Sequence, residues 1–176
     1  QTKDWHFGFN ATFSYNKSKI TKLFNGYTEY AMPDYLLCYA VGHDAGEFYM
    51  QKFRGVNPEN GNPQWEVVDP ETGAISLTEN FNNATMQLLG KSRYAPYYGG
   101  FGVDASWKGI SLAANFTWNY GKYTVNNMLL FLESPGNATS FNSGKHLLNM
   151  WRKPGDITNV PKWGTNPQFD SHMLED

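Results

Sequence analysis

Histidine, cysteine and acidic residues could carry chemistry in this chain, but their spacing argues against a catalytic or metal site. None of the histidines has a second ligand at the short spacing that metal sites use. Cys38 is the single cysteine, which excludes a disulfide within the chain. The four histidines are His6, His43, His146 and His172. We therefore expect neither a bound metal nor a cofactor.

The acidic residues that follow one another closely lie in turn sequences. Glu59 belongs to Asn-Pro-Glu-Asn-Gly at residues 57 to 61, while Asp69 and Glu71 belong to Asp-Pro-Glu-Thr-Gly at residues 69 to 73. Both sequences are typical of β-turns, which explain these carboxylates without catalysis. No nucleophile elbow, phosphate-binding loop or metalloprotease motif occurs. We therefore predict no catalytic residue and no enzymatic activity.

Aromatic residues in the polar, loop-like stretches are the better candidates for a functional role. Aromatic rings bury a large area at a low entropic cost, so they could stack on a ligand or pack against a partner protein. The alternative is that they pack the loops on themselves. The candidates for ligand or partner contact are Trp65, Tyr94, Tyr97, Phe141, Trp151 and Trp163.

Composition excludes two classes of protein. The net charge is −2, which gives no electrostatic basis for binding nucleic acid. No apolar run approaches the ~18 residues of a membrane helix, so a helical membrane protein is excluded as well. Few charges (17%) and many aromatics (16%) instead favour an all-β chain with long polar loops.

A hairpin over residues 99 to 121 organises the rest of the chain. Apolar residues alternate with polar or small ones on both sides of a two-residue turn at Lys108-Gly109. Folding the chain back at this turn sets Phe101 opposite Phe116 and Trp107 opposite Ile110. A two-residue loop fixes this register, and a slip of one residue would mix the two faces. We predict an antiparallel pair over residues 99–108 and 110–121.

The apolar face of this hairpin has two possible environments. A tilted strand needs about ten residues to cross a bilayer, and residues 110 to 120 supply that length with aromatics at both ends. The opposite face carries Asp104 and Asn115, which suits a wet lumen. The strands of a soluble β-sandwich also alternate, so the pattern alone leaves both a membrane barrel and a sandwich open.

Three further strands are expected, near residues 4–16, 35–41 and 47–55. Together with the hairpin they would make five strands of one transmembrane β-barrel domain, with residues 122–176 as mostly extracellular loop. Barrels keep their inner turns short, so the Lys108-Gly109 turn is expected on the periplasmic side. Five strands also leave two edges, and we expect the edge amides of residues 7–13 and one side of residues 112–118 to lack partners in this chain.

Several motifs in a fixed order resemble the C-terminal half of SusC/RagA-type TonB-dependent outer-membrane transporters of Bacteroidetes. They cover nearly the whole chain, at residues 13–20 (Phe-Ser-Tyr-Asn-Lys-Ser-Lys-Ile), 42–49 (Gly-His-Asp-Ala-Gly-Glu-Phe-Tyr), 55–63 (Gly-Val-Asn-Pro-Glu-Asn-Gly-Asn-Pro), 89–92 (Leu-Gly-Lys-Ser), 98–101 (Tyr-Gly-Gly-Phe), 151–154 (Trp-Arg-Lys-Pro) and 160–162 (Val-Pro-Lys). Asn57 departs from the Asp that the family often has, and Lys162 from the Arg.

The resemblance implies an internal part of a much larger barrel without its plug domain. It implies a multi-pass outer-membrane protein, in contact with lipid, that imports oligosaccharides or peptides together with a SusD-like surface lipoprotein. Contact with TonB would be made by a plug region that is not in this chain. The alternative function is a secreted β-sandwich that binds carbohydrate or mediates adhesion.

Overall fold

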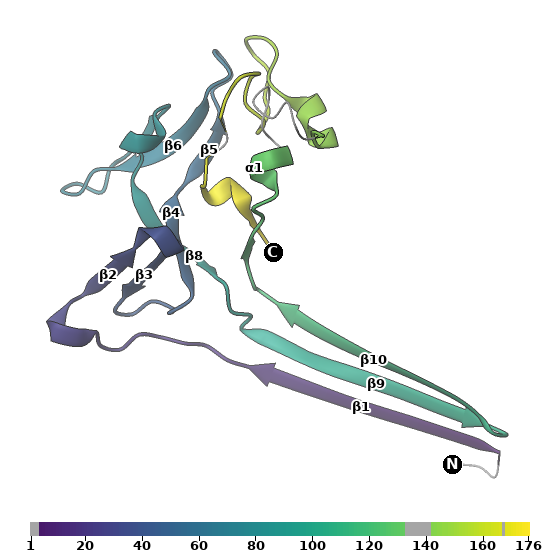
Figure 1. Ribbon diagram of the computed structural model, residues 1–176. Helices are drawn as coiled ribbons and strands as arrows, with labels where there is room; N and C mark the ends of the chain where they lie inside the picture. Colours follow the sequence, from purple (N-terminus) through teal and green to yellow (C-terminus); the bar gives the residue numbers. More distant parts are fainter. Residues whose placement is uncertain (1–3, 133–141, 167) are drawn as a thin grey trace.

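The computed structural model describes residues 4–132, 142–166 and 168–176. It consists mostly of antiparallel strands with one short α-helix. Three long strands, β1 (Trp5–Tyr15), β9 (Tyr97–Trp107) and β10 (Ile110–Tyr120), form a narrow sheet that projects from a body of shorter elements (Figure 1). We call this body, residues 16–96 and 121–176 as far as they are described, the loop domain.

The predicted hairpin is confirmed in its register. β9 and β10 pair antiparallel, with Phe101 opposite Phe116 and Trp107 opposite Ile110. The turn places both Lys108 (φ 44°) and Gly109 (φ 88°) in the left-handed region, as a two-residue hairpin requires. Lysine is a strained choice there, and its ammonium group lies 5.3 Å from the centre of the Trp107 ring.

One face of the sheet is apolar and uncovered. Phe7, Phe9 and Leu112 are 69%, 70% and 73% exposed, so no second sheet packs against this face in the described residues. Aromatic side chains lie at both ends of it. Trp5 stacks on Trp107 at the turn end. The soluble sandwich, which needs a buried apolar face, is therefore not supported.

Two edges of the sheet are open, as expected. The order is β1-β9-β10, and within the described residues neither β1 nor β10 has a partner on its outer side. Both long excursions of the chain, after Tyr15 and after Tyr120, leave from the same end of the sheet (Figure 1). The Lys108-Gly109 turn lies at the opposite end, next to the start of β1.

The prediction of five neighbouring strands is wrong in its second and third members. β1 pairs directly with β9, in a register running from Trp5–Trp107 to Tyr15–Tyr97. Residues 35–41 and 47–55 instead belong to the loop domain, where they contribute short strands of four or five residues. Strands this short cannot cross a bilayer, which takes about ten residues. Within the apolar run of residues 35–41, Leu37, Cys38 and Ala40 are buried in the loop domain, whereas Tyr35 and Val41 are exposed.

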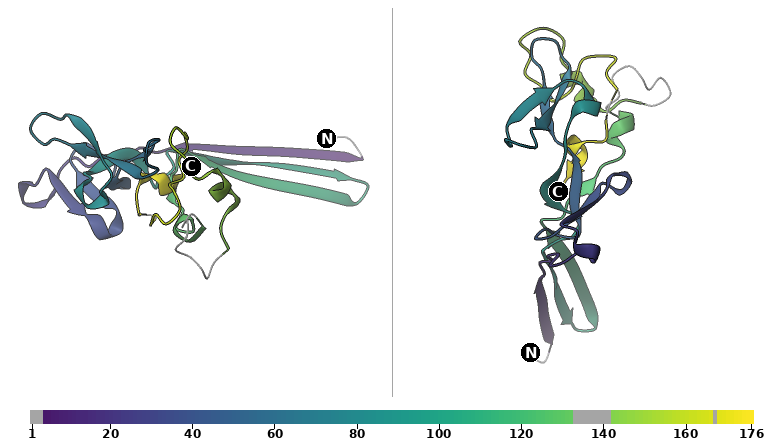
Figure 2. Two further views of the ribbon diagram at one scale, coloured as in Figure 1. Left: turned by 90° about the horizontal axis from the view of Figure 1, so that it is seen from above. Right: turned by 90° about the vertical axis from the view of Figure 1, so that its left-hand side faces the viewer.

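The loop domain holds two small sheets and one strand pair, seen from two further directions in Figure 2. The first sheet has the order β2-β3-β4-β8, the second β5-β6-β7, and β11 pairs with β12. The strands are β2 (Glu29–Met32), β3 (Leu37–Ala40), β4 (Glu47–Gln51), β5 (Phe53–Val56), β6 (Pro63–Val68), β7 (Ile75–Thr78), β8 (Met86–Ser92), β11 (Thr124–Val125) and β12 (Leu174–Glu175).

The helical segments are single turns. The α-helix α1 spans Leu129–Leu132. The 3₁₀ turns are Phe24–Gly26, Pro33–Tyr35, Phe81–Asn83, Lys145–Asn149 and Ser171–Met173. None of the described helices has the length and apolarity needed to cross a membrane.

The C-terminal segment completes the core of the loop domain. Leu174 packs with Phe48 and Met50 of β4, and all three are buried. β12 also pairs with β11, which follows β10 in the chain. The C-terminal segment therefore connects β11 with the sheet that contains β4. Burial of these apolar side chains stabilises the domain by roughly 1.5–3 kcal/mol each.

Candidate functional site

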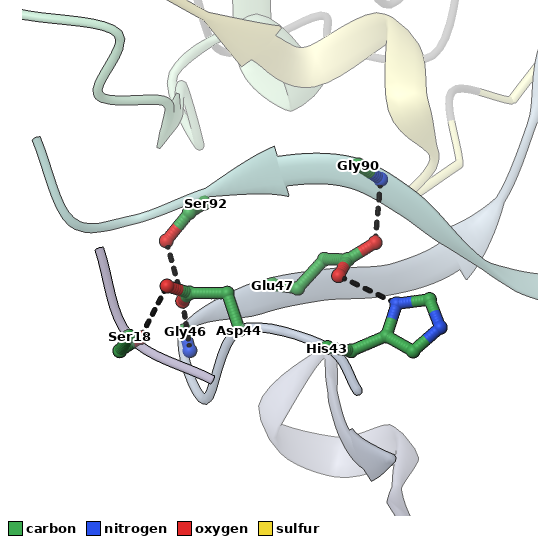
Figure 3. Close-up of polar contacts among 7 residues, drawn as sticks. All are labelled: Ser18, His43, Asp44, Gly46, Glu47, Gly90 and Ser92. Carbon is green, nitrogen blue, oxygen red and sulfur yellow. Dashed lines mark hydrogen bonds and ion pairs between the residues drawn. The ribbon is translucent and has the colours of Figure 1, made fainter. Parts of the chain in front are cut away.

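A polar cluster fixes the loop domain to the exit of β1 (Figure 3). The Asp44 carboxylate accepts hydrogen bonds from the Ser18 hydroxyl, from the Ser92 hydroxyl (2.9 Å) and from the Gly46 backbone N–H (2.6 Å). Burial raises the pKa of Asp44, but these three bonds outweigh it and hold the pKa below its ordinary value. The charged carboxylate therefore connects three separate segments of the chain.

Glu47, three residues later, makes a second set of bonds in the same place. Its carboxylate accepts from the Gly90 backbone N–H at 2.6 Å and lies 3.0 Å from Nδ1 of His43. Its side chain is buried, whereas that of His43 is half exposed. The Gly-His-Asp-Ala-Gly-Glu motif thus has a structural role: it positions β8 against β4 and the segment after β1 (Figure 3).

A second polar cluster organises the far side of the loop domain around Glu79. Its carboxylate accepts hydrogen bonds from the side-chain amides of Asn57 (2.7 Å), Asn60 (2.9 Å) and Asn62 (2.7 Å). These bonds, with a smaller contribution from Lys162, lower the pKa of Glu79. The Asn-Pro-Glu-Asn-Gly turn is therefore held through its asparagines and not through Glu59.

The same turn carries the loop that follows residue 150. Trp151 donates its indole N–H to the Pro58 carbonyl at 3.0 Å and packs closely on Gly61. The Lys162 N–H donates to the Gly61 carbonyl, also at 3.0 Å. A side chain at position 61 would collide with the Trp151 ring, so the turn and the loop form one unit.

A groove opens between this unit and β6. Trp65, Phe81 and Trp163 supply its aromatic walls, while Asn82 and Gln168 supply carboxamides. No hydrogen bond from either carboxamide to another described residue is present. A carboxamide offers both donors and an acceptor, so the groove presents free polar groups next to apolar rings. This combination suits a ligand that carries amides or hydroxyls next to apolar groups.

Of the six predicted aromatic contacts, the five that fall in the described residues lie in five different environments. Trp65 is 3% exposed, and its indole N–H donates to the buried Asp170 carboxylate. Tyr97 lies on the apolar face of the sheet, 5.0 Å from the Tyr15 ring. Trp163 is 66% exposed at the rim of the groove.

The remaining candidates are distributed elsewhere. Trp151 packs into the turn described above. Tyr94 is exposed in a cleft at the end of the long strands, and Phe141 lies outside the described residues. Sequence reasoning did not identify Asn82 or Gln168, because single polar residues in loops carry no distinguishing pattern.

The histidines do not converge. His6 lies 3.4 Å from Asp104 on the polar face of the sheet, His43 lies beside Glu47, and the His172 ring packs 5.0 Å from the Phe53 ring. No three residues of ligand type come together in the part of the chain that the structure describes.

Comparison with known proteins identifies the family. No family model and no curated protein sequence matches the chain. Among solved structures, the RagAB peptide transporter matches 100% of the chain at 38% identity with a TM-score of 0.83. The RagAB peptide importer in its 'open-open' state matches the same share at 37% identity with a TM-score of 0.85. The chain belongs to the SusC/RagA family.

The match extends over the long strands and the loop domain together, since the whole chain is covered. The chain spans about a fifth of the length of the structures that it matches (20% and 19%). The SusC/RagA proteins in these structures are transporters and not enzymes.

Proposed function

We propose that this chain forms part of the wall and of the outer loops of an outer-membrane peptide importer. The observation that carries the proposal is the uncovered apolar face of β1, β9 and β10, with aromatic side chains at both ends. Eleven residues at ~3.3 Å each, tilted by ~45°, span about 26 Å, which agrees with the ~25 Å apolar band of an outer-membrane barrel.

The likeness to the RagAB peptide transporter supports peptides as the cargo. It also supports a SusD-like lipoprotein as the partner, with contact to TonB made elsewhere in the longer protein. The test is uptake of labelled peptides and of labelled oligosaccharides by cells with and without the gene. Loss of peptide uptake alone supports the proposal, and loss of oligosaccharide uptake alone contradicts it.

Within the loop domain, we assign peptide contact to the groove at Trp163. An extended peptide presents an N–H and a C=O at every residue, which the carboxamides of Asn82 and Gln168 can pair, while the exposed indole covers an apolar side chain. We expect Trp163→Ala in the full-length transporter to weaken peptide binding by about tenfold, the effect of losing an aromatic contact of ~1–2 kcal/mol. Tyr27→Ala, at an exposed aromatic ring that does not line the groove, is the matched control.

A further inference from the structure

The end of the long sheet that carries the loop domain bears lysines directly beyond its aromatic residues. Lys17 follows Tyr15 by two residues, and Lys122 follows Tyr120 by two residues. Both lysines are exposed. None of the ion pairs found among the described residues involves either of them.

The depth of Lys17 relative to the apolar face is set by β1. The β1–β9 pairing continues one residue past β1, because the Asn16 N–H donates to the Pro96 carbonyl at 2.9 Å. Two residues beyond Tyr15 correspond to ~5–7 Å along the membrane normal, depending on tilt. A headgroup layer is about 5–8 Å thick on each side of the hydrocarbon core. With the aromatic rings of Tyr15 and Tyr97 at the edge of the hydrocarbon core, Lys17 lies in the headgroup layer.

A cleft at this position joins the apolar face to polar groups. Its lining includes the phenol rings of Tyr15 and Tyr97 together with Lys17. Asp44 lines the same cleft, but its carboxylate is already bound by Ser18, Gly46 and Ser92. Lys17 is therefore the charged side chain of the cleft that can bind a ligand. Phenol rings beside a cation suit the boundary between acyl chains and headgroups.

The spacing of the two lysines suits a lipid with more than one phosphate. β9 separates β1 from β10, so the two strands are about 10 Å apart. The turn end of the sheet differs, since Asp4 accompanies Lys108 there. Only the loop-domain end therefore combines aromatic rings with two unpaired lysines among the described residues.

We infer that Lys17 and Lys122 bind the phosphorylated headgroup of a lipid in the outer leaflet, with its acyl chains on the face of β1 and β10. This inference rests on the proposed function, because it requires that the apolar face contacts lipid. A basic residue near an anionic membrane surface contributes roughly fivefold in affinity, so two contribute about 30-fold.

The experiment measures lipid retained by the full-length transporter in mild detergent, by native mass spectrometry with added lipid A. Lys17→Gln/Lys122→Gln is expected to lower the affinity for bisphosphorylated lipid A about 30-fold, while the Arg substitutions at both positions restore it. Lys108→Gln, at the other end of the sheet, is the matched control and should bind as the unmodified protein does.

Three results would overturn the inference, the first two of which concern lipid A. One is equal binding by the Gln variant and the unmodified protein, and the other is equal binding of lipid A and its dephosphorylated form. Inorganic phosphate that binds as tightly as lipid A would likewise contradict a lipid site. None of these results bears on the proposed function, which peptide uptake by cells tests separately. A purified protein that stays soluble without detergent would instead contradict the membrane assignment itself.

Discussion

The indole N–H of Trp65 donates a hydrogen bond of 2.6 Å to the Asp170 carboxylate, 105 residues later in the chain. Both residues are buried. The other oxygen of Asp170 accepts from the His172 N–H at 2.8 Å and so begins the last 3₁₀ turn. One carboxylate therefore ties β6 to the C-terminal segment whose Leu174 completes the core.

The first prediction concerns this bond. Trp65→Phe keeps the ring but removes the donor, and a lost hydrogen bond to a buried charge costs about 1.5–3 kcal/mol. We expect faster amide hydrogen exchange at residues 171–175 of the full-length protein. Trp151→Phe is the matched control, since its indole bonds to a carbonyl at a more exposed site, and it should cost ~1 kcal/mol or less. Equal exchange in the two variants would contradict this prediction.

The second prediction concerns acid. The pKa of Glu79 is lowered from its ordinary 4.5, chiefly by the hydrogen bonds from Asn57, Asn60 and Asn62. A group with a lowered pKa in the folded state adds stability above its unfolded pKa, and this stability is lost as the pH falls through the folded pKa. We therefore expect the turn at residues 57–61 to loosen as the pH falls below about 4.5.

Trp151 packs on this turn, so its fluorescence and hydrogen exchange at residues 57–62 should follow the transition. Glu79→Gln is the control: it removes the charge and the pH response in this range together. A transition of the same size in Glu79→Gln would assign the effect to another group.

Parts of this fold could be predicted from the sequence because a local pattern determines them. The alternation around Lys108-Gly109 fixes both the register and the faces of β9 and β10, since any slip would place Phe101 and Phe116 on different sides. The partner of β1 could not be predicted in this way. Its first contact with β9, Tyr15 with Tyr97, closes a loop of more than eighty residues, and nothing local to β1 indicates where that loop ends.

The candidate site was predictable only in part, for a similar reason. Trp163 is exposed at the groove, whereas Trp65 is buried and bonded to Asp170, which is distant in sequence. The short strand β6 was missed because Pro63 and Gln64 interrupt its pattern, so Trp65 was expected in a loop. Similarly, the role of Glu79 arises from three asparagines within residues 57–62, a separate segment of the chain.

The third prediction concerns topology. Both long excursions leave the sheet at one end, and the Lys108-Gly109 turn lies at the other. Because outer loops are long and inner turns short, protease added to intact cells should cut within residues 123–163 and spare Lys108. Permeabilised cells provide the control, in which Lys108 becomes accessible. Cleavage at Lys108 alone in intact cells would reverse the orientation.

The last prediction uses two neighbouring alanines of β10 to test the two faces of the sheet. Ala114 lies opposite Val103 in the apolar row, near the middle of the strand, whereas Ala113 lies opposite Asp104 in the polar row. An arginine on the lipid face near the bilayer midplane costs about 2–4 kcal/mol. At position 113 the same arginine meets the Asp104 carboxylate across the strand pair, at a distance suited to an ion pair.

We therefore expect Ala114→Arg to reduce the folded, heat-modifiable fraction of the full-length protein in outer-membrane vesicles, and Ala113→Arg to leave it nearly unchanged. The two variants share residue type, strand and change in volume, so their difference reports the environment of each face. If Ala113→Arg proved the more damaging of the two, the apolar face would not be the one in contact with lipid.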